Sequence, residues 1–465
     1  MINFLPTSQK DMTRLGWNQL DIIIINGDAY VDHPAFGPIL IARFLEAKGF
    51  KVGIISQPDC KTNSDFLKLG SPRLFFGISA GNMDSMINLY TAQKKLRSKD
   101  AYSPEGKTGL RPNRATIVYT QKVRTLFKDV PVVLGGIEAS LRRIPHYDYW
   151  SNKLRNSILF DSKADILVYG MGEKPVLEIA ERLAAGEQID KLDNIRGTVV
   201  ISRNNSAEEQ LPDFSNSFSR QDFIKQHRIF EKHYREKVLT QKFGDRFLIH
   251  NPPAHPQSRG EMDEIYNIPF TREPHPMYKG KKIPAFLQIR NSVTSHRGCF
   301  GGCSFCAIGV HQGKTIQSRS RDSILKELKE VTLKEYFKGT ISDIGGPTAN
   351  MYEMHCKHNI SETCQQNSCL FPSICPQLDI SHKEQKKLLS STRKLQSIKH
   401  VFVSSGIRFD LALNDEEYIQ QLAKFHVSGL LKLAPEHKSG KVLKLMNKPS
   451  FDLYERFRQY FGTYC

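Results

Sequence analysis

The chain of 465 residues has no long hydrophobic run and no biased or repetitive tract. Its longest apolar stretches, such as Ile22–Ile25, fall far short of the roughly 18 residues that a membrane-spanning helix needs. The first residues also lack the charged, apolar and small-residue order of a secretory signal. A content of 39% hydrophobic and 25% charged residues excludes a disordered or fibrous protein. We therefore expect a globular, cytoplasmic protein with no membrane partner.

Cysteine is scarce and unevenly placed. The nine cysteines are too few for a disulfide scaffold, and Cys60 is the only one in the first 298 residues. The others fall in the last part of the chain, at Cys299, Cys303, Cys306, Cys356, Cys364, Cys369, Cys375 and Cys465. Thiols gathered in this way in a cytosolic chain indicate metal binding or catalysis rather than disulfides. We expect Cys60 and Cys465 to be incidental.

Acidic residues are outnumbered, with 48 Asp and Glu against 66 Lys and Arg, which gives a net charge of +18. An excess of this size favours an anionic partner such as nucleic acid or a phosphate-bearing substrate. The excess is divided evenly between residues 1–283 and 284–465, and there is no basic tail. Nucleic acid is therefore retained as a candidate partner on charge alone.

The N-terminal region alternates between strand and helix patterns. The run DIIIIN at 21–26 predicts a strand buried on both faces. Apolar residues at helical spacing over 38–45, followed by Gly49, predict a helix with its C-terminal cap. The pattern continues with strands at 51–55, 73–79, 131–134 and 165–169 and helices at 114–128 and 175–183. We predict an α/β fold with an open parallel sheet and helices on both faces, a Rossmann-like domain over 1–202.

Ligands of such sheets bind at the carboxyl ends of the strands, here 27–37, 135–140 and 169–173. No G-x-G-x-x-G sequence is present there, so a nicotinamide dinucleotide is not expected. The arrangement resembles the cobalamin-binding type of Rossmann domain. The Asp-x-His-x-x-Gly pattern of that type is not met, because Asp32 and His33 are adjacent. We expect the fold without cobalamin.

Residues 203–283 are rich in Asn, Ser, His and Pro and contain one expected helix, around 223–238. Turn-rich stretches of this kind are typical of connecting segments. The chain after it, 284–465, begins with an expected strand at 285–293 that runs into TSHRGCFGGCSFC at 294–306.

This stretch holds Cys299, Cys303 and Cys306 in the spacing C-x-x-x-C-x-x-C. Three thiolates on one short loop suit an iron–sulfur cluster or zinc. A structural zinc site needs a closed set of four ligands, and the second cysteine pair of a zinc ribbon is missing. Three ligands and one open iron are what chemistry at a 4Fe-4S cluster requires. The string GKT at 313–315 is no P-loop, because Ile308 stands where the first glycine belongs.

With Phe305 before the last cysteine, this motif resembles that of the radical S-adenosylmethionine superfamily. The resemblance extends to the YgiQ-type proteins of that superfamily through 4–8, 27–37, 294–320, 342–352, 404–413 and 431–449. It implies a radical S-adenosylmethionine enzyme that cleaves S-adenosylmethionine reductively to a 5′-deoxyadenosyl radical and takes its electron from a flavodoxin- or ferredoxin-type protein. The substrate stays unknown. The alternative is a non-catalytic iron–sulfur or zinc protein.

The resemblance also implies roles for single residues. The 4Fe-4S cluster would be held by Cys299, Cys303 and Cys306. The cofactor S-adenosylmethionine would lie near the backbone of Phe305, near Gly345 and Gly346, and near the later strand ends at Ser404, Arg408 and Glu436. Pro347 stands where the family pattern has a glutamate, so a side-chain contact to the methionine amino group is not expected there.

Strand and helix patterns after the motif predict a partial TIM-like barrel, with strands near 315, at 340–344, 399–404 and 430–433. Helices are expected at 439–446 and 451–460. Because YgiQ-type proteins continue well beyond residue 449, we expect a truncated chain whose barrel lacks its last strand and whose activity is uncertain.

A second group of cysteines, Cys356, Cys364, Cys369 and Cys375, has the spacing C-x7-C-x4-C-x5-C. Four thiols within 20 residues are enough to bind an auxiliary iron–sulfur cluster or a zinc ion. The alternative is a set of reduced thiols in an inserted loop.

Overall fold

The computed structural model describes residues 3–215 and 217–464 and divides into two compact units. Unit 1 comprises Met1–His255 and Ile268–Leu287, and unit 2 comprises Pro256–Asn267 and Gln288–Cys465. Most of the segment 203–283, which we expected to connect two domains, therefore lies in unit 1. No helix among the described residues is long and apolar enough to cross a membrane.

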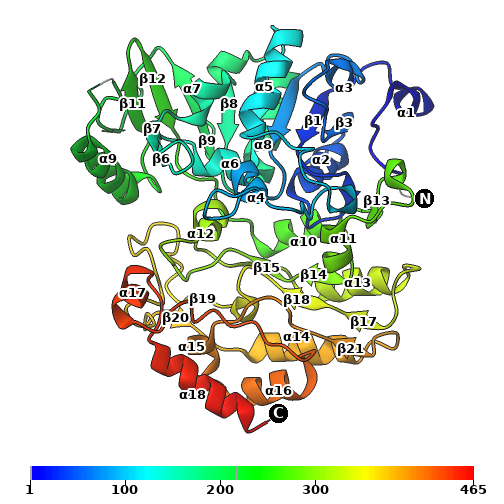
Figure 1. The fold of residues 1–465 in the computed structure, drawn as a ribbon, viewed down its shortest axis with the longest axis vertical. Coiled ribbons are helices and arrows are strands. Elements are labelled where there is room, and N and C mark those ends of the chain that lie inside the picture. The colour runs from blue at the N-terminus through cyan, green and yellow to red at the C-terminus, as the bar shows by residue number, and fades with distance from the viewer. Residues whose placement is uncertain (1–2, 216, 465) are drawn as a thin grey trace. The chain divides into compact units, whose positions relative to one another are not determined.

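Unit 1 is built on a mixed sheet whose strand order is β10-β11-β12-β9-β8-β5-β4-β1-β3 (Figure 1). Its parallel part agrees with the prediction and consists of β1 (Ile22–Asn26), β3 (Val52–Ser56), β4 (Phe75–Ser79), β5 (Val132–Leu134) and β8 (Ile166–Val168). Each run is apolar up to its last residue because both faces of these strands are buried, and β1, β3 and β4 end on a polar residue.

The sheet does not end at β8, as an open parallel sheet would. It continues through antiparallel strands β9 (Thr198–Ser202), β12 (Arg246–His250) and β11 (Leu239–Phe243), and β10 (Glu209–Gln210) pairs parallel to β11. Strands β11 and β12 form a hairpin around Gly244, whose φ of +62° suits a tight turn. Helix α9 (Arg220–His233) precedes the hairpin and starts at a capping box of Ser219 and Asp222.

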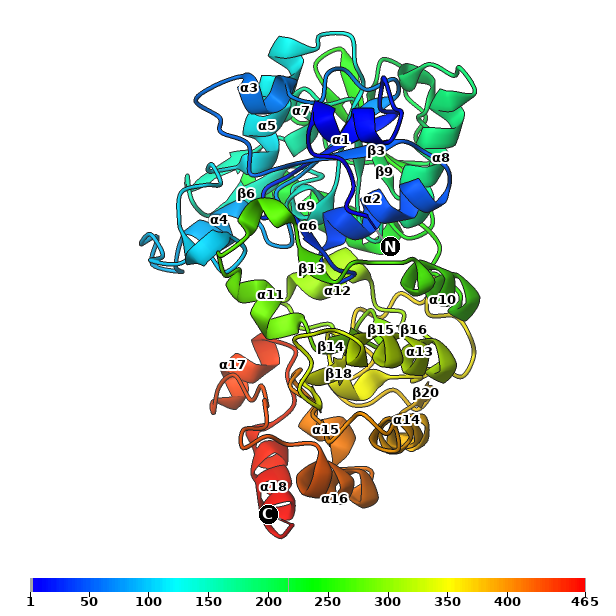
Figure 2. The same cartoon turned by 90° about the vertical axis from the view of Figure 1, so that its right-hand side faces the viewer.

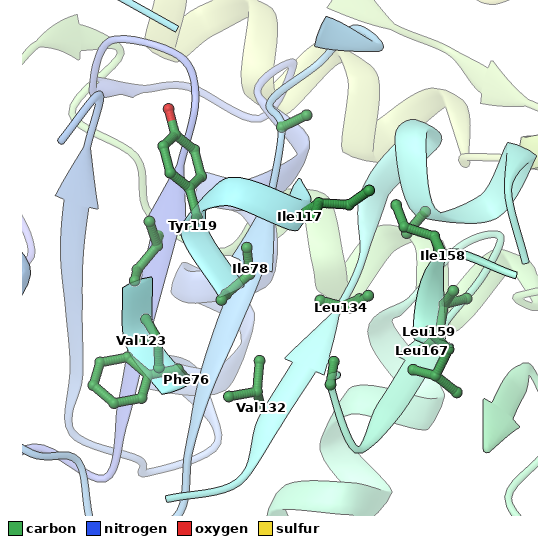
Figure 3. Packing of buried hydrophobic residues seen from close by; sticks show 14 of the residues in the cluster. Phe76, Ile78, Ile117, Tyr119, Val123, Val132, Leu134, Ile158, Leu159 and Leu167 are labelled. Atoms are coloured by element: carbon green, nitrogen blue, oxygen red, sulfur yellow. The ribbon is translucent and has the colours of Figure 1, made fainter. Parts of the chain in front are cut away.

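Helices cover both faces of this sheet. Helix α2 (Gly37–Ala47) contacts β1, β3 and α8 (Glu173–Ala184). Helix α5 (Ala115–Leu126) contacts β4 and α7 (Ile158–Ser162). Figure 3 shows Tyr119 and Val123 of α5 packed over Phe76 and Ile78 of β4 in the main core of the unit. Alternate strand residues point to opposite faces, so each strand contributes to both layers.

Unit 2 is an α/β arrangement of short parallel strand pairs with helices, consistent with a partial barrel. Strand β14 (Ser292–Thr294) pairs with β18 (Asp343–Gly345), and β17 (Thr340–Ile341) pairs with β21 (His400–Val401). Helix α13 (Arg321–Thr332) packs against β14 and α14 (Lys383–Arg393) (Figure 2). Helix α14 also packs against β21 (Figure 1).

Three strand predictions in unit 2 were wrong in detail. The stretch 285–293 is mostly helix α11 (Pro284–Ile289), since Pro284 suits the first turn of a helix, and only its end enters β14. The segment near 315 forms β16 (Gln317–Ser318), which pairs antiparallel with β15 (His296–Arg297) as a hairpin and is no barrel strand. The stretch 430–433 makes a single bridge, from Leu433 to Ile407.

The end of the described chain is helical, as predicted. Helices α17 (Gly440–Leu445) and α18 (Phe451–Gly462) follow each other, and α18 packs against α15 (Phe409–Ala412) and α16 (Glu416–Phe425). Phe457 of α18 is fully buried in the core of unit 2.

Candidate cluster site

The three-cysteine loop lies between β15 and α12 (Ala307–Gln312). Gly298 opens it with a φ of +84°, and a Cβ there would lie 2.0 Å from the backbone oxygen of Thr315. Only glycine fits this close approach, which folds the loop back along the β15–β16 hairpin. Cys306 is the N-cap residue of α12, and its amide donates to the oxygen of Cys303 at 3.1 Å. All three cysteines are half-buried free thiols.

Gly301 lies at the centre of this loop. A Cβ at Gly301 would lie 3.3 Å from Cys299 Sγ, 3.8 Å from Cys303 Sγ and 3.4 Å from Arg408 Nη1. The structure thus brings together two of the predicted ligands and the predicted residue Arg408, and the missing side chain of Gly301 leaves space beside the two sulfur atoms. Two thiols beside such a space, with Cys306 later in the same loop, are of a chemistry that fits a cluster held by thiolates.

Arg408 is buried and held on both sides. Its Nε and Nη2 donate to the two carboxylate oxygens of Asp410 at 2.8 and 2.6 Å, and its Nη1 lies 3.7 Å from Cys303 Sγ. The amide of Arg408 donates to Asn350 Oδ1 at 2.8 Å. Asp410 and Asn350 were missed from the sequence, although Asp410 lies only two residues after Arg408. This pair of hydrogen bonds to the carboxylate of Asp410 fixes the guanidinium in one orientation.

Burial and nearby positive charge have opposite effects on the pKa of Cys303. Burial raises the pKa of the Cys303 thiol, and the positive charges of Arg408 and Lys448 oppose that rise. Lys448 is itself buried and lies 3.6 Å from the carboxylate of Glu436. Glu436, expected to face the cofactor, is therefore engaged in an ion pair with Lys448. The two cations therefore offset part of the effect of burial, and the pKa of Cys303 stays above its usual range.

Gly346 follows β18 and approaches His296 closely. A Cβ at Gly346 would lie 2.6 Å from His296 Nε2, which is 3.0 Å from the oxygen of Thr348. Burial lowers the pKa of His296 to about 4, so its ring is neutral at pH 7 and Nε2 donates to Thr348. Thr348 Oγ1 lies 3.4 Å from Cys299 Sγ. The glycine segment after β18 is thus connected to the cysteine loop through Thr348.

Ser404 and Gly345 surround Asp343. The amide of Ser404 donates to Asp343 Oδ1 at 2.8 Å, and its hydroxyl donates to the oxygen of Ser342 at 2.7 Å. A Cβ at Gly345 would lie 2.9 Å from Ser405 Oγ, which also donates to Asp343. Asp343, missed from the sequence, therefore joins the ends of two neighbouring strands. Phe305 has a side chain that is 54% exposed.

The second cysteine group lies on the segment between β18 and α14. Strand β19 (His355–Cys356) pairs with β20 (Leu378–Asp379), and the amide of Cys375 donates to the oxygen of Cys369 at 2.8 Å. All four cysteines are half-buried. Burial raises the pKa of Cys369, nearby Lys314 opposes that rise, and the other three thiolates add to it. Within residues 3–215 and 217–464, no three His, Cys, Asp or Glu side chains are grouped to hold a metal ion as they stand.

At the carboxyl edge of the unit 1 sheet, His33 is buried, and burial holds its pKa well below the usual range. Its Nδ1 accepts from the amide of Ala35 at 3.1 Å, and its Nε2 lies 2.8 Å from Arg272 Nη2. The neighbouring Asp32 accepts hydrogen bonds from Arg43 and from the amide of Thr271. With both ring nitrogens engaged, His33 does not fit the role of a cobalt ligand.

The chain is similar to known proteins over nearly its whole length. The family model "Radical SAM N-terminal" matches residues 4–292. A UPF0313 protein of Rhodopseudomonas palustris is 48% identical, over 98% of this chain and 72% of the relative. The UPF0313 protein YgiQ of Escherichia coli K12 is 44% identical, over 99% of this chain and 71% of the relative.

Among solved structures, the chain is similar in fold to the radical S-adenosylmethionine methyltransferase TsrM of Kitasatospora setae, solved with tryptophan and an analogue of S-adenosylmethionine. The TM-score is 0.52 at 15% identity, over 95% of this chain and 65% of that chain, which is less than two thirds of its length. The chain therefore belongs to the UPF0313 family that includes YgiQ, and it has the fold of the radical S-adenosylmethionine proteins.

Proposed function

We propose that the protein is a radical S-adenosylmethionine enzyme whose 4Fe-4S cluster is held by Cys299, Cys303 and Cys306. The observation that carries the proposal is the gathering of free thiols around Gly301, with the guanidinium of Arg408 against one of them. When bound, such a cluster passes an electron from a flavodoxin- or ferredoxin-type reductant to S-adenosylmethionine, which splits into methionine and a 5′-deoxyadenosyl radical.

The chain's own residues supply position and charge. Gly301 leaves the space beside two thiols, and Arg408 and Lys448 favour the deprotonated form of Cys303, which is the form that binds iron. We assign the methionine end of S-adenosylmethionine to the backbone at Gly345 and Gly346, which follow the same strand edge as the cysteine loop. The backbone beside Phe305 would take the adenine.

Ser404 and Glu436 act indirectly in this proposal. Ser404 helps to hold Asp343, which fixes the end of β18, and Glu436 orients Lys448. Both are positioning residues, because their polar groups are engaged with the protein itself.

The experiment is anaerobic purification with iron and sulfide analysis, followed by dithionite and S-adenosylmethionine. We expect 5′-deoxyadenosine from the native chain. Replacing Cys299, Cys303 and Cys306 by Ala should remove about four irons per chain and all of the 5′-deoxyadenosine. Cys60→Ala, a half-buried thiol of unit 1, is the matched control and should change neither. Unchanged iron in the triple variant would contradict the cluster assignment, and a loaded, reducible cluster without 5′-deoxyadenosine would contradict the activity.

A further inference from the structure

The four thiols of Cys356, Cys364, Cys369 and Cys375 have no part in the proposed reaction, yet the fold holds their segment in place. Its ends are joined by the β19–β20 pair, in which Cys356 lies opposite Leu378. Leu370 and Leu378 are buried in a small core, and Cys369 and Cys375 pack against it. These contacts hold Cys369 and Cys375 in place against the small core.

This segment forms hydrogen bonds directly with the three-cysteine loop. The amide of Cys369 donates to the oxygen of Phe300 at 3.0 Å, and Ser368 Oγ donates to the oxygen of Gly301 at 2.7 Å. A Cβ at Gly302 would lie 2.4 Å from the oxygen of Asn367, so the two backbones are in close contact. Phe300 belongs to the same small core as Leu370. The two cysteine groups are therefore neighbours within unit 2.

The charge of the segment suits several thiolates. Lys314 Nζ donates to the backbone oxygens of Cys364 and Gln366, which places its positive charge in this segment. A cation beside several thiolates offsets part of their mutual repulsion.

The donor set points to iron and sulfide. Zinc frameworks typically bring two cysteine pairs, each separated by two to four residues. Here only Cys364 and Cys369 have that spacing, because the other two intervals are seven and five residues. Four cysteines are the usual ligand set of both 2Fe-2S and 4Fe-4S clusters. In the described chain, the sulfur atoms of neither cysteine group are close enough together to hold a metal ion. In both groups they would have to move together when a cluster binds.

We propose that Cys356, Cys364, Cys369 and Cys375 bind a second iron–sulfur cluster beside the first. This centre does not depend on the proposed cleavage of S-adenosylmethionine, and it is assembled from ligands that the first cluster does not use.

The test uses the full chain with Cys299, Cys303 and Cys306 replaced by Ala, reconstituted anaerobically with iron and sulfide. We expect this variant to retain about two or four irons with matching sulfide, and an iron–sulfur absorption and Mössbauer signal. Adding Cys364→Ala and Cys369→Ala to this variant should remove the iron and sulfide together with the spectroscopic signal. Thr363→Ala, at the exposed position beside Cys364, is the matched control and should keep the cluster.

Two outcomes would overturn the proposal: a triple variant that holds no iron, or one that holds about one zinc ion and no sulfide. Because the retained cluster is read in a chain whose second group is intact, a folding defect of the Cys364→Ala, Cys369→Ala variant cannot imitate it. If the first cluster assignment fails instead, the native chain still loses iron on replacing Cys364 and Cys369, and the two failures are distinguishable.

Discussion

Arg408 Nη1 lies 3.7 Å from Cys303 Sγ while the rest of the same guanidinium is held by Asp410. Arg408 is buried, so its charge acts on the sulfur with little screening by solvent. A positive donor at a ligand sulfur stabilises the reduced, more negative state of an iron–sulfur cluster.

We therefore expect Arg408→Gln to lower the reduction potential of the first cluster by tens of millivolts, on the order of the effects of hydrogen bonds to cluster sulfur. The measurement is a redox titration followed by electron paramagnetic resonance. It is made in the Cys364→Ala, Cys369→Ala background, so that a single cluster is observed. Asp410→Asn, which keeps the guanidinium of Arg408 but removes the carboxylate that offsets its charge, should not lower the potential. A potential that is unchanged in a fully loaded Arg408→Gln variant would contradict this.

Gly301→Ala should reduce iron retention several-fold, because the new methyl group would press against Cys299 Sγ and Arg408 Nη1 at 3.3 and 3.4 Å. Iron content and the rate of iron loss to a chelator are the measurements. Gly309→Ala is the matched control, since it lies in α12 with no atom within 4 Å of the new Cβ. That control should load normally and gain up to about 1 kcal/mol of helix stability. If both variants retained iron equally well, the space beside Gly301 would not be needed for the cluster.

Unit 1 contains a buried ion pair between Arg111 and Asp28, both fully buried, with Nη2 and Oδ1 2.7 Å apart. Replacing Arg111 by Met should lower the free energy of unfolding of unit 1 by about 3–5 kcal/mol, because Asp28 would stay buried without its partner. Denaturant unfolding followed by circular dichroism gives the value. The double variant Arg111→Met, Asp28→Asn should recover part of the loss. A double variant as unstable as the single one would show that packing, and not the charge, sets the cost.

His382 makes unit 2 sensitive to acid. Burial lowers its pKa to about 4 from the ordinary 6.5, and its ring stacks on Tyr418. Since the unfolded chain takes up the proton more readily, its contribution to stability is full above pH 6.5 and is lost as the pH falls toward 4. At pH 5 the loss is about 2 kcal/mol. We expect the unfolding midpoint of His382→Gln to depend less on pH between 7 and 5 than that of the native chain, while His400→Gln, at an exposed position, should follow the native curve.

The parallel strands of unit 1 could be predicted because each is apolar on both faces and ends at a turn. The β11–β12 hairpin was missed because its strands show no regular alternation of polar and apolar residues and lie within a turn-rich stretch. The helix at 284–289 was read as a strand because a short apolar run fits both, and Pro284 was the signal against a strand. At the site, spacing revealed the three thiols. Asp343, Thr348, Asp410 and Lys448 come from distant positions that only the tertiary fold brings near.

The contacts of the cysteine loop also order events during synthesis. Asn447 Nδ2 donates to the oxygen of Gly302, 145 positions earlier, and the amide of Ser304 donates to the oxygen of Met446. At about 5–20 residues per second, the ribosome makes these partners roughly 7–30 seconds after the loop. During that interval the three thiols lack the surroundings that the finished fold gives them. If the proposed cluster is bound, we therefore expect its stable insertion to be a late step, and oxygen or stray metal ions to have their best access to the thiols on the nascent chain.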